Sequence, residues 1–161
     1  MIKKFNLFIL TFCKVGKIKY APGTVASLMT CLLFLLLINI FNIFVLLLFT
    51  LIIFCYSFIA INNSFDEFNS EDPQEIVIDE VTGQMLILLA IPIYETLYPL
   101  PKIYYCFAAF LLFRLFDIWR PYPISYVDKN VKGSLGIMLD DIFASVYSII
   151  ILTIIFFLLG G

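Results

Sequence analysis

The sequence predicts an all-α, polytopic membrane helical bundle, and three observations support this fold class. Of the 161 residues, 63% are hydrophobic and 14% are charged, whereas soluble domains are about half apolar and about a quarter charged. The mean hydropathy is +1.06. The apolar residues gather in five stretches, and the charged residues lie between them. We therefore expect a single membrane-embedded domain over residues 1–161, with about four to five membrane-embedded helices and an N-terminal interfacial helix.

The N-terminal segment combines lysines with a short apolar run. Lys3 and Lys4 precede the run from Phe5 to Phe12, and further lysines follow it at positions 14, 17 and 19. A signal peptide has a similar start, but this apolar run is short and no small-residue cleavage site follows it. We expect the segment to remain in the mature chain as an interfacial helix.

The five apolar stretches differ in length. They are Val25–Ile38, Ile43–Ile61, Val81–Tyr94, Ile103–Phe113 and Ile142–Leu159. The second and the fifth are long enough to cross a bilayer, and the first reaches that length with its flanks. The third contains Pro92 and the fourth is followed by Arg114, so one or both are expected to be shallow, tilted or re-entrant.

Two turns and the placement of charges predict the topology. Asn39 and Asn42 bracket a turn after the first stretch, and residues 98–101 (Tyr-Pro-Leu-Pro) mark another after the third. If each stretch crosses once, all ten basic residues except Lys102, and all twelve acidic residues except Glu95, lie on one face. The positive-inside rule assigns that face to the cytoplasm.

The composition also excludes several kinds of chemistry. The net charge is −2, so no basic surface indicates a nucleic-acid partner. The chain has no histidine, which removes the commonest general base. Its four cysteines are scattered singly without metal-ligand spacing, and we interpret them as packing residues. Carboxylates, hydroxyls, Lys, Arg and a metal ion remain for any reaction.

A Pro-Gly turn leads into the first apolar stretch. Residues 20–27 read Tyr-Ala-Pro-Gly-Thr-Val-Ala-Ser, with Thr24 placed as a helix N-cap. Free N–H groups at such a terminus, with the hydroxyls of Thr24 and Ser27 alongside, suit a phosphate. Capping of a membrane helix explains the same turn, and on these residues alone it is the preferred interpretation.

Carboxylates mark the start of the third apolar stretch. The Asp72-Pro73 pair and Glu75 form a capping signature, which predicts that a helix begins there. Glu75 and Asp79 would then share one helix face at i, i+4, where like charges repel, with Glu80 beside them. A solvated helix start explains Glu75 well. It explains Asp79 and Glu80 poorly because their neighbours are apolar, and a bound cation would compensate their charge.

A second acidic pair, Asp140-Asp141, precedes the last apolar stretch. Two acidic pairs at neighbouring helix mouths can converge on one hard cation, because Mg²⁺ takes oxygen ligands. Upstream, Arg114 and Asp117 are spaced i, i+3, which suits an internal ion pair. The alternative is that Arg114 or Arg120 holds a phosphate while Asp117 joins the metal ligands.

Together these blocks resemble the phosphatidylglycerophosphatase A family of bacterial membrane phosphatases. Order, spacing and content agree across most of the chain. The matching residues are Pro22-Gly23-Thr24 with Ser27; Asp72-Pro73, Glu75, Ile78-Asp79-Glu80-Val81 and Gly83-Gln84; Phe113-Arg114, Phe116-Asp117, Arg120-Pro121 and Pro123-Ile124; and Gly136-Ile137-Met138 with Asp140-Asp141. Two departures are Arg120, where the family pattern has lysine, and Ser145 after Ala144, where it has glycine.

The resemblance implies an all-helical, multi-pass protein of the bacterial inner membrane with its active site on the cytoplasmic face. It implies a phospholipid phosphate substrate in the bilayer, and Mg²⁺-dependent hydrolysis of phosphatidylglycerophosphate to phosphatidylglycerol and phosphate. The residues expected to act in catalysis are Asp79, Glu80, Asp117 and Asp141. Those expected to bind the substrate phosphate are Thr24, Ser27, Arg114 and Arg120. Those expected to bind the metal are Glu75, Asp79, Glu80, Asp140 and Asp141.

The sequence lacks the signatures of several other phosphatase mechanisms. No cysteine is followed by an Arg-closed phosphate loop, and no Asp-x-Asp nucleophile loop is present. Metal-activated water remains as the nucleophile, with Asp79 or a neighbour as base, and which acid is base and which is ligand stays open.

Two other functions fit the sequence less well. A metal-dependent phospholipid phosphotransferase would carry an Asp-Gly-x-x-Ala-Arg signature, which is missing. A cation channel or transporter would spread acids through the bilayer depth, whereas these cluster at helix mouths. The sequence does not define the oligomeric state.

Overall fold

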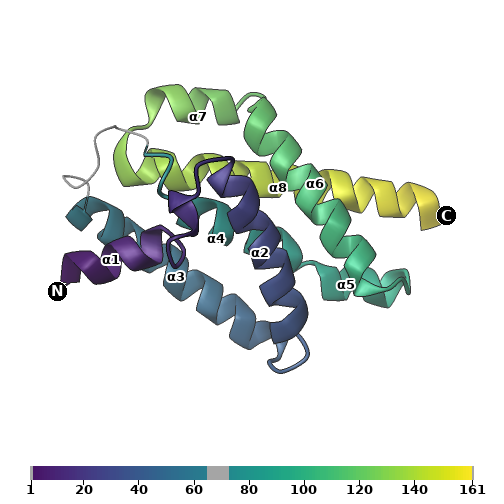
Figure 1. The fold of residues 1–161 in the computed structure, drawn as a ribbon. Coiled ribbons are helices and arrows are strands. Elements are labelled where there is room, and N and C mark those ends of the chain that lie inside the picture. The colour runs from purple at the N-terminus through teal and green to yellow at the C-terminus, as the bar shows by residue number, and fades with distance from the viewer. Residues whose placement is uncertain (1, 65–72, 161) are drawn as a thin grey trace.

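The computed structural model describes residues 2–64 and 73–160, and its elements there are all helical (Figure 1). In chain order they are α1 (Ile2–Leu10), the 3₁₀ helix η1 (Val15–Lys17), α2 (Pro22–Leu37), α3 (Ile43–Ser64), α4 (Ile78–Leu88), α5 (Ile91–Leu97), α6 (Lys102–Trp119), α7 (Ile124–Asn130) and α8 (Gly133–Gly160). The all-α fold class is confirmed.

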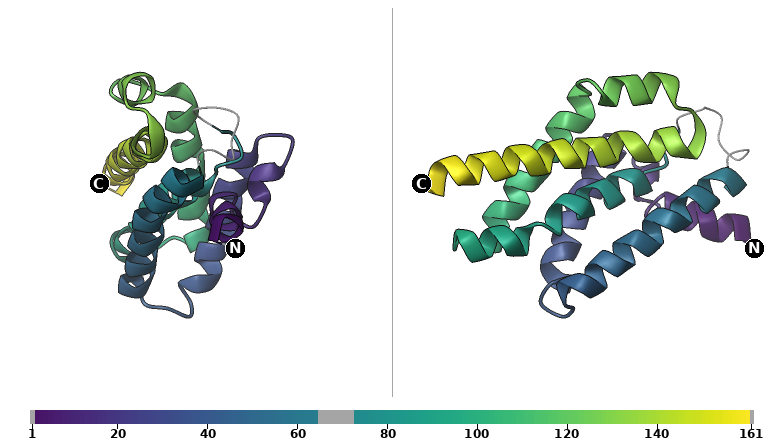
Figure 2. Two further views of the ribbon diagram at one scale, coloured as in Figure 1. Left: turned by 90° about the vertical axis from the view of Figure 1, so that its left-hand side faces the viewer. Right: turned by 180° about the vertical axis from the view of Figure 1, so that it is seen from behind.

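Helix α4 lies at the centre of the bundle. It packs against α2, α3, α6 and α8, and α8 also packs along α6 and α7 (Figure 2). Most of its side chains are buried, although it contains only 11 residues. The first turn of α4 carries Asp79 and Glu80. The architecture therefore brings two adjacent carboxylates into the interior of the bundle, where helices from both halves of the chain surround them.

A glycine allows α4 and α8 to approach closely. A Cβ atom added to Gly83 would lie 2.9 Å from Cε2 of Phe113 and 3.1 Å from the carbonyl oxygen of Asp141. Next to this contact, the buried hydroxyl of Ser145 lies 2.6 Å from the carbonyl oxygen of Gly83 and 2.8 Å from that of Asp141. The hydroxyl can donate its proton to either carbonyl, so Ser145 links α4 to α8 beside the acidic residues.

The predicted turns are confirmed, and the structure also shows a break in the third apolar stretch. Asn42 accepts a hydrogen bond from the backbone N–H of Phe44 at 2.6 Å in the connection between α2 and α3. The third apolar stretch is divided into α4 and α5, with Pro92 in the first turn of α5. A proline cannot donate the backbone hydrogen bond that a continuous helix requires, so the break falls just before it. Residues 98–101 separate α5 from α6.

Two of the described helices are long and apolar enough to cross a membrane. They are α3 and the Gly133–Leu158 part of α8. Helix α2 is apolar but has only 16 residues, and α6 carries Lys102, Arg114 and Asp117 within its 18 residues. The N-terminal segment forms the helix α1, as predicted. Length and apolarity thus identify two candidate spans, fewer than the four to five membrane-embedded helices that we expect from the sequence.

Two helix starts differ from the prediction. Helix α4 begins at Ile78 rather than at Pro73, so Glu75 does not share a helix face with Asp79. The backbone before it makes tertiary contacts instead, because the N–H of Val77 donates to the carbonyl of Leu10 at 3.0 Å. The predicted N-cap, Asp72, lies outside the described residues.

Helix α8 begins at Gly133, well before its apolar part at Ile142, so Asp140 and Asp141 lie in its third turn rather than at its mouth. A helix of 28 residues is about 42 Å long, which exceeds the roughly 30 Å of hydrocarbon in a bilayer. The first turns of α8 can therefore extend beyond the membrane. The short helix α7 in the preceding segment was not predicted.

Candidate active site

One polar cavity collects residues from all three sequence blocks. It has a volume of about 440 Å³ and lies where α2 and α4 begin, where α6 ends and beside the third turn of α8. Its acidic side chains are Asp79, Glu80, Asp117, Asp140 and Asp141, and its basic side chains are Lys19, Arg114 and Arg120. We call this space the polar cavity.

Three carboxylates converge at the floor of the polar cavity. Asp79, Glu80 and Asp141 each offer an oxygen atom, and these atoms all lie within 4.8 Å of one another. Asp79 and Glu80 come from the first turn of α4, and Asp141 comes from α8. This acidic triad brings together both residues of the first predicted acidic pair and one residue of the second.

The surroundings of the acidic triad disfavour its negative charge. Oδ1 of Asp79 and Oε2 of Glu80 are buried without a hydrogen-bond partner among the described residues. Burial, together with the charges of Glu80 and Asp141, raises the pKa of Asp79 well above its ordinary value. Burial also raises the pKa of Glu80. A group of desolvated carboxylates is therefore held together at a cost in free energy that a bound cation would offset.

The acidic triad fits a hard divalent cation. Its donors are all carboxylate oxygens, which Mg²⁺ prefers, and the neighbouring cavity leaves space for the waters or phosphate oxygens that complete a Mg²⁺ shell. The two unpartnered oxygens of Asp79 and Glu80 are lone-pair donors without another use. The residues present thus fit the metal ion that the sequence resemblance implies.

The other two expected metal ligands, Asp140 and Glu75, are not part of the acidic triad. Asp140 lines the polar cavity, but its Oδ2 is 3.6 Å from Nη2 of Arg120 and its Oδ1 accepts the backbone N–H of Asp141 at 3.0 Å. Glu75 is exposed and is not among the residues that line the polar cavity. The structure therefore does not bring Glu75 to the acidic triad, because the helix on which that prediction depended begins after it.

Two arginines line the polar cavity together with the acidic triad, Arg114 in the second half of α6 and Arg120 directly after its last residue. Arg114 pairs with Asp117 one turn later, as the i, i+3 spacing predicts, and its Nη1 lies 4.0 Å from Oε1 of Glu80. Its Nε is buried without a hydrogen-bond partner among the described residues. An unused guanidinium N–H beside a cation site is suited to a phosphate oxygen.

Arg120 is held by a network at the C-terminus of α6. It adopts the left-handed conformation (φ 47°) as the C-cap, and its Nε donates to the carbonyl oxygen of Asp117 at 3.2 Å. Its guanidinium also pairs with Asp128 of α7 and with Asp140 of α8. Arg120 therefore ties three helices together at the rim of the polar cavity.

The N-terminus of α2 forms the opposite wall. Ala21, in the left-handed conformation (φ 46°), is the N-cap, and Pro22 occupies the first helical turn. Thr24 lines the polar cavity but lies inside the helix, so its predicted role as N-cap is wrong. Proline has no backbone N–H that would need an acceptor, so it is favoured in the first helical turn. The helix therefore begins at Pro22, two residues before Thr24. A Cβ atom at Gly23 would lie 1.9 Å from Oε1 of Glu80, so a side chain at this position would displace the carboxylate of Glu80 from its place beside α2.

Ser27 does not reach the polar cavity. Its hydroxyl is fully buried and donates to the carbonyl oxygen of Gly23 at 2.9 Å within α2. A hydroxyl that bonds to the preceding helical turn is common in apolar helices. The structure thus gives no contact that supports the expected binding of phosphate by Ser27.

Several residues at or near the site were given no role in it by the sequence analysis. Lys19 and Gln74 line the polar cavity, and Asp128 partners Arg120. Gln84 is fully buried one turn after Glu80, with both amide atoms unpartnered among the described residues. Lys19 lies three residues before Pro22, and this closeness to the Pro-Gly turn is a signal that could have identified it as a site residue. Nothing in the sequence indicates the burial of Gln84.

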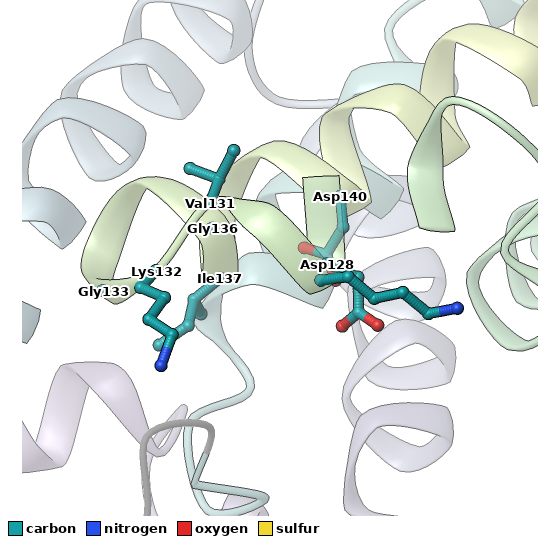
Figure 3. Close-up of a pocket in the computed structure, with 8 residues that line it drawn as sticks. Asp128, Val131, Lys132, Gly133, Gly136, Ile137 and Asp140 are labelled. Carbon is teal, nitrogen blue, oxygen red and sulfur yellow. The ribbon is translucent and has the colours of Figure 1, made fainter. Parts of the chain in front are cut away.

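A smaller cavity of about 200 Å³ adjoins the polar cavity between α7 and the first turns of α8 (Figure 3). Asp140 lines both cavities. Figure 3 shows the side chains of Asp128 and Asp140 near each other, in agreement with their shared partner Arg120, and Lys132 farther along the cavity. Asp140 therefore belongs to the walls of both cavities and connects them to Arg120 through their ion pair.

Comparison with known proteins places this site in a family. The family model for phosphatidylglycerophosphatase A matches residues 8–156. A Haemophilus influenzae protein named phosphatidylglycerophosphatase A is 35% identical over 136 residues, which cover 84% of this chain and 79% of that protein. An Escherichia coli protein of the same name is 40% identical over 77 residues, 48% of this chain and 41% of that protein.

A third relative carries a different name. The Bacteroides thetaiotaomicron protein named "Putative phosphatidylinositol-3-phosphatase" is 34% identical over 145 residues, 88% of this chain and 87% of that protein. No solved structure matches the chain. Because the family model covers most of the chain and the residues that line the polar cavity lie within its match, the chain belongs to the phosphatidylglycerophosphatase A family.

Proposed function

We propose that this protein hydrolyses phosphatidylglycerophosphate to phosphatidylglycerol and inorganic phosphate, with Mg²⁺ held by Asp79, Glu80 and Asp141. Membership of the family and the names of two relatives support the reaction. The observation that carries the site assignment is the acidic triad, which lies in one cavity with Arg114 and with the N-terminus of α2.

Glu80 connects the two halves of the proposed site. Its carboxylate belongs to the acidic triad, and its Oε1 also lies near Nη1 of Arg114 and against the backbone of Gly23. A phosphate that enters between α2 and α6 would therefore meet a guanidinium, backbone N–H groups at a helix start, and the proposed cation within one small volume. Each of these groups stabilises negative phosphate oxygens.

The remaining roles follow from the positions of the side chains. We assign Arg114 and the first turn of α2, including Thr24, to the substrate phosphate, and Arg120 to the rim, where Asp140 and Asp128 orient it. When bound, Mg²⁺ supplies Lewis-acid stabilisation of the charge on the phosphoryl group. Asp117 holds the guanidinium of Arg114 in place through their ion pair.

The reaction requires one proton acceptor. The oxygen of water forms a new bond to phosphorus, the bond between phosphorus and the glycerol oxygen breaks, and the water proton passes to a carboxylate of the polar cavity. The departing glycerol oxygen takes up a proton, which the same carboxylate can return, so that the carboxylate ends the reaction deprotonated. We assign the acceptor role to Asp79 or a neighbouring carboxylate of the polar cavity, because these groups lie in the space that the phosphate would enter.

The location of the site fits a lipid substrate. We propose that the chain is a multi-pass protein of the bacterial inner membrane and that the polar cavity opens at the cytoplasmic face. Two candidate spans support membrane insertion. Three lysines of the N-terminal segment, at positions 14, 17 and 19, shortly precede the start of α2 in the sequence, and Lys19 lines the polar cavity. The connection between α5 and α6, at the far end of α6, has the Glu95–Lys102 ion pair (3.4 Å) nearby. This asymmetry agrees with the positive-inside rule.

Transport of a cation fits the charge distribution less well. A conduction path needs polar groups through the depth of the membrane. Among the described residues, the acidic triad and both arginines gather at one end of the bundle, and the apolar cluster around Phe34, Tyr105 and Leu152 fills the other. We therefore retain hydrolysis as the proposed function.

The headgroup can be tested directly. The purified protein would be given phosphatidylglycerophosphate or phosphatidylinositol 3-phosphate in mixed micelles, with Mg²⁺ or with a chelator, and phosphate release would be measured. We expect Mg²⁺-dependent release from phosphatidylglycerophosphate at a higher kcat/KM than from the inositol lipid. The opposite preference would assign the protein the activity named for its Bacteroides relative, and release from neither lipid would contradict the proposal.

A further inference from the structure

A second hollow lies beside the polar cavity and has the opposite chemistry. It has a volume of about 330 Å³, lies between α2 and α6, and is lined by apolar or weakly polar side chains. Its walls include Leu28, Leu32 and Leu35 of α2 and Ile103, Phe107 and Phe110 of α6. We call it the apolar groove. Its volume is within the range of about 300–1,000 Å³ that is usual for small-molecule sites.

The apolar groove continues the walls of the polar cavity. On α2, Leu28 and Leu35 follow Thr24 by four and eleven residues, so they lie on the same helix face. On α6, Phe110 and Ile103 precede Arg114 by the same intervals. Thr24 and Arg114 both line the polar cavity. The two helices therefore carry one continuous strip from a charged end to an apolar end.

The floor of the apolar groove is made of small side chains. Cys31 of α2 and Cys106 of α6 are 5% and 2% exposed, and the thiol of Cys31 lies 3.9 Å from the carbonyl oxygen of Cys106. The rim residues Leu32 and Phe107 are 54% and 61% exposed. Larger residues at the two cysteine positions would fill the space, so the cysteines keep the groove open while the helices remain in contact.

The dimensions suit an extended hydrocarbon chain. Each wall covers about 16 Å from Thr24 or Arg114 to its far end, at the helical rise of about 1.5 Å per residue. Two other apolar hollows lie between α2, α3 and α4 and between α1, α3 and α4, and they contain no residue from the strip that runs from Thr24 or from Arg114. The apolar groove is thus the described hollow that an amphiphile could enter with its phosphate in the polar cavity.

We propose that the apolar groove binds one acyl chain of the substrate lipid while the phosphate of the same molecule lies in the polar cavity. The proposal rests on the proposed function, because it requires a lipid phosphate as substrate. An acyl chain that moves from the bilayer into the groove leaves one apolar environment for another, so little hydrophobic free energy is gained. The groove therefore acts mainly by orienting the lipid for reaction.

Filling the groove should make the enzyme sensitive to acyl chain length. Leu32→Trp covers the exposed rim, and Cys106→Phe fills the floor. The matched control is Cys55→Phe, because Cys55 of α3 is exposed and does not line the groove. Each variant would be assayed in mixed micelles with dihexanoyl and dipalmitoyl phosphatidylglycerophosphate.

We expect Leu32→Trp and Cys106→Phe to lower kcat/KM about tenfold for the long-chain lipid, and to leave the short-chain value within about twofold of wild type. The control should match wild type on both. Equal losses of kcat/KM on both lipids, or no loss on either, would contradict binding of the acyl chain in the apolar groove. If Cys106→Phe does not fold, the rim variant decides. Absence of turnover by wild type on both lipids would instead contradict the proposed function.

A second experiment does not depend on turnover. Phosphatidylglycerophosphate with a diazirine near the end of one acyl chain would be photolysed with the protein in nanodiscs, and phosphatidylcholine with the same label would serve as control. We expect adducts on the groove residues Leu32 and Phe107 from the lipid phosphate in clear excess over the control lipid. Equal labelling by both lipids would show that the groove takes any bilayer lipid and would overturn the proposal.

Discussion

Asp79 in the first turn of α4 and Asp141 in the third turn of α8 place carboxylate oxygens within 4.8 Å of each other. The close packing of the two helices makes this possible, because Gly83 leaves no side chain between α4 and the backbone of Asp141. Like charges at this distance repel, so the packing that holds them together must be strong or must be assisted by a cation.

The hydroxyl of Ser145 should contribute to this packing. Ser145→Ala removes the hydrogen bond to the carbonyl of Gly83, and we expect a loss of about 1 kcal/mol in stability together with a higher Mg²⁺ concentration for half-maximal activity. Ser148→Ala is the matched control, since Ser148 is equally buried but bonds within α8, to Ala144. Thermal unfolding in detergent and a Mg²⁺ titration measure both effects. Identical behaviour of the two variants would show that the link between helices is unimportant.

Arg114 and Arg120 should affect substrate binding to different degrees. Lysine keeps the charge but loses the planar fork, so Arg114→Lys should raise KM for the lipid by about tenfold. Arg120→Lys should raise it less, because Arg120 already pairs with Asp128 and Asp140. Lys102→Arg, beyond the far end of the groove, is the control. Wild-type kinetics in both lysine variants would show that the two arginines have a structural role and do not bind the substrate phosphate.

Much of the site could be predicted from the sequence because its signals are local. Acidic pairs next to apolar stretches, an arginine one turn before an aspartate, and a Pro-Gly turn are visible in the chain and do meet in one cavity. The break before Pro92 follows from the missing N–H of proline.

The errors arose where tertiary contacts override local signals. The segment around Glu75 carries a capping signature, yet it packs in an irregular conformation against Gly16, where an added Cβ atom would lie 1.9 Å from the carbonyl oxygen of Glu75. The sequence also gives no sign that Asp140 pairs with Arg120 rather than with the acidic triad, since that choice depends on how α6, α7 and α8 pack. The apolar stretch predicts the part of α8 from Ile142 onward but not the turns from Gly133 to Asp141 that precede it.

The topology can be tested with reporter tags. We expect tags at the N-terminus and between residues 62 and 70 to report the cytoplasm, and a tag near Pro99 to report the opposite side, because the basic residues other than Lys102 lie away from Pro99 in the topology. Accessibility of a single cysteine in intact and in permeabilised cells would measure this. Labelling near residue 70 from outside intact cells would overturn the shared cytoplasmic face.

Stability without metal should depend on pH in a defined direction. Because burial raises the pKa of Asp79, the folded protein binds this proton more tightly than the unfolded chain does. Stability should therefore be greatest at low pH and should decrease as the pH rises from the ordinary carboxyl range through the raised pKa. Thermal unfolding with a chelator from about pH 5 to about pH 9 measures it, and Asp79→Asn should flatten the decrease. Parallel curves for the variant and wild type would argue against a strained Asp79.

The most direct measurement of the central claim combines hydrolysis across a Mg²⁺ titration with thermal unfolding, for wild type, Asp79→Asn and Asp141→Asn. Asparagine keeps the shape of the side chain but removes its charge, so both variants should insert and fold, and should unfold at an equal or higher temperature than metal-free wild type. Both should lose Mg²⁺-supported release of phosphate from phosphatidylglycerophosphate. Turnover near the wild-type value in both variants would contradict a metal site formed by Asp79, Glu80 and Asp141.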